Sequence, residues 1–128
     1  MSARKVVDDF IASWKGSDMD KIMSYLSPDC RYHNIPWEEV QGTEAIRKTL
    51  EGFMKGVSQI EFVVHKTAEA GDTVMNERTD RFQMKGQWLD LPVMGVFEVK
   101  DGKIAAWRDY FDAQMFEKQL AKVRTAAQ

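Results

Sequence analysis

Cysteine is nearly absent from this chain of 128 residues, which contains one, Cys30. A single cysteine excludes an intrachain disulfide and fits a reducing cytoplasm, where thiols stay reduced. Long apolar runs are also missing, since no segment approaches the ~20 apolar residues of a membrane-spanning helix. The first ten residues, MSARKVVDDF, are too charged for the apolar core of a signal peptide. The sequence therefore predicts a soluble, globular protein of the cytoplasm.

An excess of basic charge is lacking too. The formal net charge is −2 at pH 7, and lysine and arginine are spread along the chain. Nucleic-acid binding needs a basic patch, so no nucleic-acid partner is expected. The two histidines, His33 and His65, lie far apart without a set of carboxylate ligands, so we expect no metal site. Cys30 has no matching arrangement of histidine and asparagine, which argues against a catalytic thiol.

Apolar residues at helical spacing come first along the chain. The expected helices cover residues 3–15, about 18–26, 43–56 and about 113–124. Ser17 or Asp18 is expected to cap the second helix and Thr43 the third. Pro28 follows the end of the second helix, and Pro36 stops a short strand over RYHNIPW at 31–37.

Alternation with a period of two takes over from Ser58. The expected strands run over about 58–68, 72–84, 88–99 and 103–112, with short breaks at AGD, KGQ and KDGK. Consecutive strands with such short breaks predict an antiparallel meander. Helices followed by a sheet indicate an α+β fold, and the length suits one domain over 1–128.

The segment NERTDRF at 76–82 places charges on an apolar strand face. Residues i and i+2 of a strand point to the same side, so Arg78 and Asp80 share a face with apolar residues. That face consists of Val74, Asn76, Arg78, Asp80, Phe82 and Met84. The opposite set contains Glu77 and Arg81 and is typical of a solvent face. Buried carboxylates are costly unless they are paired and hydrogen-bonded, so this pair needs a reason.

A second carboxylate occupies a similar place in the strand expected over 103–112. Asp109 shares a face with Trp107 and Phe111, which is the more apolar of the two faces. Neither face is cleanly polar, so alternation alone leaves open which one points inward. The short strand adds Tyr32 and Asn34 on a common face, whose neutral hydrogen-bonding tips suit a water or a substrate oxygen.

An arginine between two aspartates can serve catalysis. The guanidinium has five donors in a rigid fork and can hold Asp80 and Asp109 in fixed orientations. Desolvation and like-charge repulsion then favour keeping one carboxyl protonated, which yields one acid and one base. The alternative is that Arg78 and Asp80 form a structural ion pair and that Asp109 is exposed.

Three motifs in order resemble the limonene-1,2-epoxide hydrolase family, a branch of the nuclear-transport-factor-2-like and SnoaL-like superfamily. They are YHN at 32–34, RTD at 78–80 and WRDYFD at 107–112. The order of the elements is similar over nearly the whole chain. The resemblance implies a strongly curved mixed or antiparallel sheet, with three N-terminal helices packed in its concavity and a cone-shaped pocket.

The resemblance also implies a chemistry, namely addition of water to an epoxide in one step without metal, cofactor or covalent intermediate. Asp80 matches the general acid on the epoxide oxygen, and Asp109 matches the base on the water. Tyr32 and Asn34 match the residues that hold that water, and Arg78 matches the bridge between the acids. The resemblance further implies a homodimer through the outer face of the sheet.

The substrate is expected to be a small lipophilic, cyclic or terpene-like epoxide in a mostly apolar pocket. Candidate wall residues are Trp107, Phe111, Leu89, Leu91, Phe82, Met23 and Leu26, although ordinary core packing also explains most of them. Two other functions remain open on such a fold: an isomerase or polyketide cyclase, and a binding module without catalysis. Substituting either aspartate would stop turnover by an enzyme and spare ligand binding by a binding module.

Overall fold

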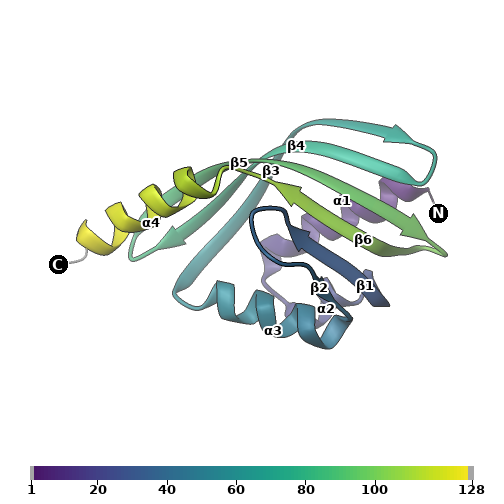
Figure 1. Cartoon of the computed structure of the whole chain (residues 1–128), viewed down its shortest axis with the longest axis horizontal. Coiled ribbons are helices and arrows are strands. Elements are labelled where there is room, and N and C mark those ends of the chain that lie inside the picture. Colours follow the sequence, from purple (N-terminus) through teal and green to yellow (C-terminus); the bar gives the residue numbers. More distant parts are fainter. Residues whose placement is uncertain (1, 127–128) are drawn as a thin grey trace.

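Six strands form one mixed sheet in the order β2-β1-β6-β5-β4-β3. The computed structural model describes residues 2–126. The strands are β1 (Leu26–Asn34), β2 (Val40–Gln41), β3 (Val57–Ala70), β4 (Thr73–Met84), β5 (Gln87–Lys100) and β6 (Lys103–Tyr110). The helices are α1 (Ala3–Ser13), a 3-10 turn (Trp14–Gly16), α2 (Met19–Met23), α3 (Thr43–Met54) and α4 (Ala113–Ala126). The expected α+β class is confirmed, with α1 and α2 before the first strand, α3 between β2 and β3, and α4 after the last strand (Figure 1).

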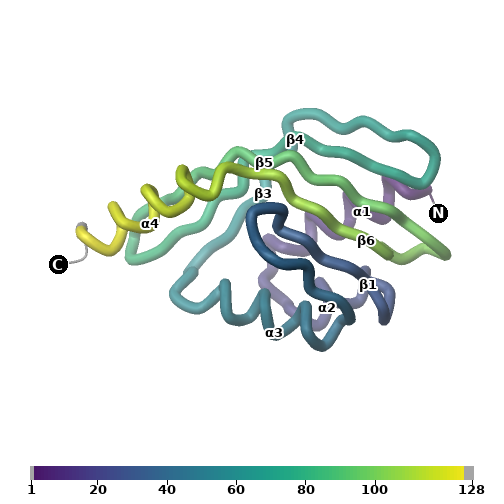
Figure 2. The backbone as a smooth tube through the Cα atoms, viewed as in Figure 1, coloured from purple at the N-terminus to yellow at the C-terminus, as the bar shows by residue number. Residues whose placement is uncertain are grey.

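Strands β3 to β6 form the antiparallel meander that the sequence predicts (Figure 2). Two-residue turns join the last three strands. In the turn between β5 and β6, Asp101 and Gly102 have φ of 53° and 76°. Two successive positive φ values match the right-handed twist of the flanking strands, so this turn fixes the register of β6 against β5.

The short strand differs from its prediction. It begins at Leu26 rather than at Arg31, and α2 ends at Met23 rather than near Leu26. Pro28 therefore lies inside β1 instead of after a helix. The pairing of β1 with β6 is interrupted between Leu26 and Arg31, where the missing N–H of a proline breaks no bond of this ladder. From Arg31 onward β1 runs parallel to β6, which makes the sheet mixed.

Two helix starts are set by capping residues. The N-cap of α3 is Gly42, with φ of 93°, and not Thr43, which is the first helical residue. A positive φ favours glycine, and the Gly42 N–H bonds to the carbonyl of Cys30, which ties α3 to β1. The last strand ends at Tyr110, because the Asp112 carboxylate accepts hydrogen bonds from the N–H groups of Gln114 and Met115 at the start of α4.

Helix α1 packs against one face of the sheet, on the far side in the view of Figure 1. Its Phe10 is fully buried, with ring centroids 5.0 Å from Trp107 and 6.1 Å from Phe97. The inward residues of β4 and β5 complete this core, as their alternation predicts. None of the helices within residues 2–126 has both the length and the apolar composition that a bilayer crossing requires.

Candidate active site

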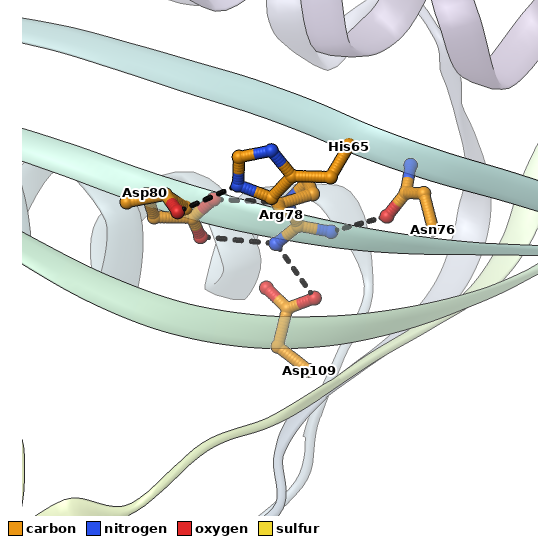
Figure 3. A network of polar contacts seen from close by, with 6 residues as sticks. His65, Asn76, Arg78, Asp80 and Asp109 are labelled. Carbon is orange, nitrogen blue, oxygen red and sulfur yellow. Dashed lines mark hydrogen bonds and ion pairs between the residues drawn. The ribbon is translucent and has the colours of Figure 1, made fainter.

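Arg78 lies at the centre of a buried polar network (Figure 3). Its Nε and Nη2 donate to Oδ1 and Oδ2 of Asp80 at 2.9 and 3.0 Å, which is a two-pronged ion pair. Nη2 also donates to Oδ1 of Asp109 at 3.1 Å, and Nη1 donates to Oδ1 of Asn76 at 2.7 Å. A single guanidinium therefore holds both aspartates, as the rigid fork predicts.

The network spans three strands. Asn76, Arg78 and Asp80 come from the inward face of β4, while Asp109 comes from β6 on the far side of β5. All four side chains are buried, with Arg78 1% and Asp109 5% exposed. Their burial confirms that the apolar face of each strand points inward. It also excludes the alternative in which Asp109 is exposed.

Burial and charge set the protonation of this cluster. Burial raises the pKa of Asp80 from 3.8 to about 6, against the opposing effect of the Arg78 charge, and the neighbouring Asp109 adds to the rise. Burial acts to lower the pKa of Arg78, but the charges of Asp109 and Asp80 outweigh it and raise that pKa, so the guanidinium stays charged. Asp80 is thus a carboxyl that holds a proton at higher pH than an exposed aspartate does.

Tyr32 and Asn34 lie beside Asp109. The parallel pairing of β1 with β6 places Asn34 next to Asp109 and Tyr32 next to Trp107. The Asn34 amide donates to the Tyr32 hydroxyl at 2.8 Å, and the Tyr32 ring stacks on Trp107 with centroids 4.1 Å apart. Burial raises the pKa of Tyr32, which therefore keeps its hydroxyl proton. The pair offers donor and acceptor groups within the reach of a small molecule beside Asp109.

A cavity of about 300 Å³ adjoins both aspartates. Its polar lining groups come from Asp80, Asp109, Tyr32, Asn34 and Thr49. The remaining lining residues are apolar: Trp14, Trp37, Leu50, Phe53, Ile60, Phe62, Phe82, Leu91, Val93, Trp107, Phe111 and Phe116. An apolar chamber with a few convergent polar groups is the usual form of a site for a small lipophilic molecule.

Comparison with known proteins identifies the family. The family model for the limonene-1,2-epoxide hydrolase catalytic domain matches residues 1–122. The chain belongs to the limonene-1,2-epoxide hydrolase family. A curated relative, epoxide hydrolase EphG of Mycobacterium tuberculosis, is 33% identical over 116 residues, covering 91% of this chain and 77% of EphG. The resemblance drawn from the three motifs is confirmed, and with it the enzyme type, an epoxide hydrolase of the limonene-1,2-epoxide hydrolase kind.

Solved structures agree with the family. The structure of an LEH-like epoxide hydrolase from Mycobacterium tuberculosis superposes with a TM-score of 0.82 at 32% identity, covering 97% of this chain and 92% of that one. A putative polyketide cyclase from Pseudomonas putida has a TM-score of 0.78 at 23% identity, covering 93% and 98% of the two chains. At that identity the second match shows the fold alone. The fold of the limonene-1,2-epoxide hydrolase family is thus shared with proteins of other names.

The cavity wall differs in part from its prediction. Trp107, Phe111, Leu91 and Phe82 line the cavity as expected. Leu89, Met23 and Leu26 do not line it and are buried in the core instead. Met23 and Leu26 flank the connection from α2 to β1, and Leu89 lies beside α4, whose Gln119 bonds to the backbone of Asp90.

Several lining residues were missed because they come from elements with no motif. Trp14, Phe53 and Phe116 belong to helices whose apolar stripes predicted only core packing. Trp37 follows Pro36 in the loop after β1, and its ring packs edge-on against Phe111 with centroids 5.3 Å apart. Nine of the 17 lining residues are aromatic, and three of these nine lie in the predicted helices, so a search for aromatics there would have found Trp14, Phe53 and Phe116.

The remaining candidate groups of the sequence lie outside the cavity. His33 contacts the carbonyl of Trp37, and His65 contacts the hydroxyl of Thr79, which points away from the buried face of β4. Cys30 is buried, and burial raises the pKa of its thiol to about 12. Among residues 2–126, histidine, cysteine, aspartate and glutamate side chains form no cluster of three that could hold a metal ion.

Proposed function

We propose that this protein adds water to a lipophilic, cyclic or terpene-like epoxide and releases a vicinal diol. One observation carries the proposal: a single arginine holds two buried carboxylates at the wall of an apolar cavity, and one of them has a raised pKa. Epoxide opening needs a proton on the oxygen and a nucleophile on the far side of the carbon. Two carboxylates in different protonation states meet both needs.

The roles follow from the chemistry of each group. Asp80 donates its proton to the epoxide oxygen as the C–O bond breaks. Asp109 takes a proton from the water whose oxygen attacks the epoxide carbon, and Asn34 and Tyr32 hold that water in line. Asp80 ends ionised and Asp109 protonated, so passage of one proton between them through water restores the starting state. Arg78 keeps its charge throughout and stabilises whichever carboxylate is ionised.

The proposal includes the finer shape expected for the family. A strongly curved sheet would hold the three N-terminal helices in its concavity, and the cavity would be the inner end of a cone-shaped pocket. Residues 1–128 would act as one catalytic domain. Trp107, Phe111, Leu91 and Phe82 would contact the substrate, and the aromatic wall favours a flat or cyclic apolar skeleton.

Diol formation in isotopic water tests the function and the mechanism together. The purified protein would be given a panel of cyclic and terpene epoxides, including limonene 1,2-epoxide, and the diol measured by mass spectrometry. With enzyme in excess over substrate in ¹⁸O-water, direct attack by water labels the diol in the first turnover. Unlabelled diol would reveal a covalent ester and contradict the one-step mechanism, and no diol from any epoxide would refute the function.

The pH dependence of kcat/KM follows from the state of Asp80. The acid must hold a proton, and the pKa of Asp80 is raised to about 6. We therefore expect kcat/KM to fall above about pH 6, approaching tenfold for each pH unit, because the ionised form cannot donate. The profile would be measured with one epoxide between pH 4 and 9. A rate that stays level from pH 6 to 8 would remove Asp80 as the acid.

A homodimer through the outer face of the sheet is part of the proposal. Exposed apolar side chains there include Met75, Met94 and Tyr110, where a soluble monomer usually has polar ones. Met94 pairs with Tyr110 across β5 and β6, so these two exposed apolar side chains are neighbours on that face. Light scattering at micromolar concentration is expected to give twice the monomer mass of 14.8 kDa. A monomer mass at every concentration tested would exclude the dimer.

A further inference from the structure

Gly95 occupies the centre of the polar network without contributing a side chain. It lies on β5, opposite Asn76 on β4 and opposite Asp109 on β6. A Cβ built at this position would overlap Nη1 of Arg78. It would also lie 2.9 Å from Oδ1 of Asn76 and 3.0 Å from Oδ1 of Asp109. The space above Gly95 is therefore filled by the guanidinium and its partners.

The backbone does not explain this glycine. Other glycines of the described chain, such as Gly42 and Gly102, have positive φ, but Gly95 lies in the regular part of β5 outside that range. Glycine inside a strand weakens it, because the chain loses more freedom and buries no side chain. The inward positions on either side of it are Val93 and Phe97, which are large and buried. Glycine is therefore needed at position 95 for the space it leaves and not for a special backbone conformation.

The position of Arg78 shows why room is needed. Arg78 is on β4 and Asp109 is on β6, so their backbones are two strand spacings apart, roughly 10 Å. To reach Asp109, the guanidinium must lie flat over β5. Arg78 pairs with Val93, and Gly95 is the diagonal neighbour in the direction of Asp109. Any side chain at 95 would close this path.

Asn76 fixes the guanidinium from the other end. Its Oδ1 accepts from Nη1 at 2.7 Å, whereas Nη2 is shared between the two aspartates at 3.0 and 3.1 Å (Figure 3). The contact at Nη1 sets the rotation of the planar group, and the rotation decides whether Nη2 reaches Asp109. We call the space above Gly95 that the guanidinium fills the slot. The slot and the oxygen of Asn76 together define one orientation of the guanidinium.

We propose that Gly95 and Asn76 are positioning residues for the reaction, which act through Arg78 by holding its guanidinium over β5 so that one nitrogen bridges Asp80 and Asp109. The proposal rests on the proposed function for its kinetic effect, although its structural content can be tested without substrate. Neither residue touches the substrate in this scheme. Their task is to keep the acid and the base at fixed relative positions, which the rate depends on steeply.

Gly95→Ala is the decisive variant, and Gly52→Ala is its matched control. Gly52 lies in α3, where an added Cβ meets nothing within 4 Å, so the control should keep wild-type kinetics. For Gly95→Ala we expect kcat to fall by a factor on the order of ten or more with little change in KM, because the displaced fork no longer holds both carboxylates. The pH above which kcat/KM falls should also rise, since a carboxyl that loses its contact with Arg78 is harder to ionise. Wild-type kcat and pH profile in a folded Gly95→Ala protein would overturn the proposal.

Asn76→Leu tests the other contact, because leucine is close to asparagine in size but accepts no hydrogen bond. It is expected to lower kcat and to shift the pH profile in the same direction as Gly95→Ala. The double variant should lose less than the product of the two single losses, because both changes act on one guanidinium. Independent, multiplicative effects would show that the two residues do not act through Arg78.

Two measurements decide the proposal even if no epoxide is turned over. The first is the titration of the aspartate carboxyl carbons by NMR, which should change in Gly95→Ala and stay unchanged in Gly52→Ala. The second is a thermal-unfolding cycle at pH 5 that combines Gly95→Ala with Arg78→Gln. If the slot serves the guanidinium, Gly95→Ala should lower Tm strongly in the wild type and little beside Arg78→Gln. An equal loss of Tm, or failure to fold in both backgrounds, would show that the glycine serves the backbone and refute the proposal.

Discussion

Replacing Asp80 or Asp109 by asparagine is expected to remove epoxide turnover and to preserve the fold. Asparagine has nearly the same shape as aspartate but neither donates a carboxyl proton nor accepts one as a base. Each general acid or base role is worth roughly 10²–10⁴-fold in rate, so each variant should lose at least about a hundredfold in kcat. Diol formation and circular dichroism would be measured on the same samples.

Asp90→Asn is the matched control for both variants. Asp90 is an exposed aspartate on β5 that pairs with Arg81 at a distance of 2.9 Å and lies outside the cavity. It should keep its turnover, so a loss in the site variants would belong to the site. Wild-type activity in either Asp80→Asn or Asp109→Asn would exclude that residue from the mechanism. Turnover by the wild type that disappears in both site variants is the pattern expected for an enzyme, whereas a binding module would bind the ligand without turnover in the wild type and in the variants alike.

Asp80 also links stability to pH with a definite sign. Its pKa in the folded protein is about 6, above the 3.8 of the free side chain, so the folded state binds the proton more tightly. Its contribution to the free energy of unfolding is complete below pH 3.8 and is lost as pH rises through about 6. The free energy of unfolding of the wild type in urea should fall by on the order of 3 kcal/mol over this pH range. The Asp80→Asn variant should show a smaller fall.

Arg78→Gln is expected to destabilise the protein by about 3–5 kcal/mol at pH 7, because it leaves two buried carboxylates without their cation. Arg78 is fully buried and carries ion pairs to Asp80 and Asp109 at 2.9 and 3.1 Å. At pH 5 the loss should be smaller, since carboxyls without a cation become protonated. The free energy of unfolding would be measured in urea at both pH values.

Arg81→Gln provides the contrast on the same strand. Arg81 pairs with Asp90 on the solvent side of the sheet, where its side chain is 31% exposed. Exposed ion pairs contribute about 0–1 kcal/mol, so this variant should unfold at nearly the wild-type urea concentration. If Arg78→Gln and Arg81→Gln lowered the free energy of unfolding equally, burial would not determine how much the Arg78 ion pairs matter. The expectation that removing a buried arginine is costly would then be wrong.

The site could be predicted well from the sequence where a strand alternates regularly. The period of two in β4 places Arg78 and Asp80 on the same face as Val74 and Phe82, which is the inward face. The inward position of Asp109 could not be predicted from alternation alone, because β6 contains a bulge. Glu98 pairs with Ala106 and Val99 with Ile104, so Ala105 is the extra residue. The bulge buries Ile104 on the same side as Trp107 and blurs the alternation.

Other parts of the site depend on contacts that no local pattern encodes. The parallel pairing of β1 with β6 brings Asn34 beside Asp109, and strand periodicity alone gives no partner for β1. The cavity wall draws on a loop and on three helical segments, whose apolar stripes look the same whether they face a core or a cavity. Gly95 is recognisable in the sequence, because it is a glycine among the large apolar residues at the inward positions of β5. Its role, however, depends on Arg78 from the neighbouring strand.

The parallel pairing of β1 with β6 also bears on when the site can form. The two strands come from opposite ends of the chain, and closing so large a loop is entropically costly and slow. The hairpin of β3 and β4 can form from local contacts and already contains Arg78 and Asp80. Until β6 docks, Arg78 lacks Asp109, and Asn34 has no strand beside it. The assembly of the acid–base pair is therefore a late event of folding, and a chain that stops before Lys103 would hold half of it.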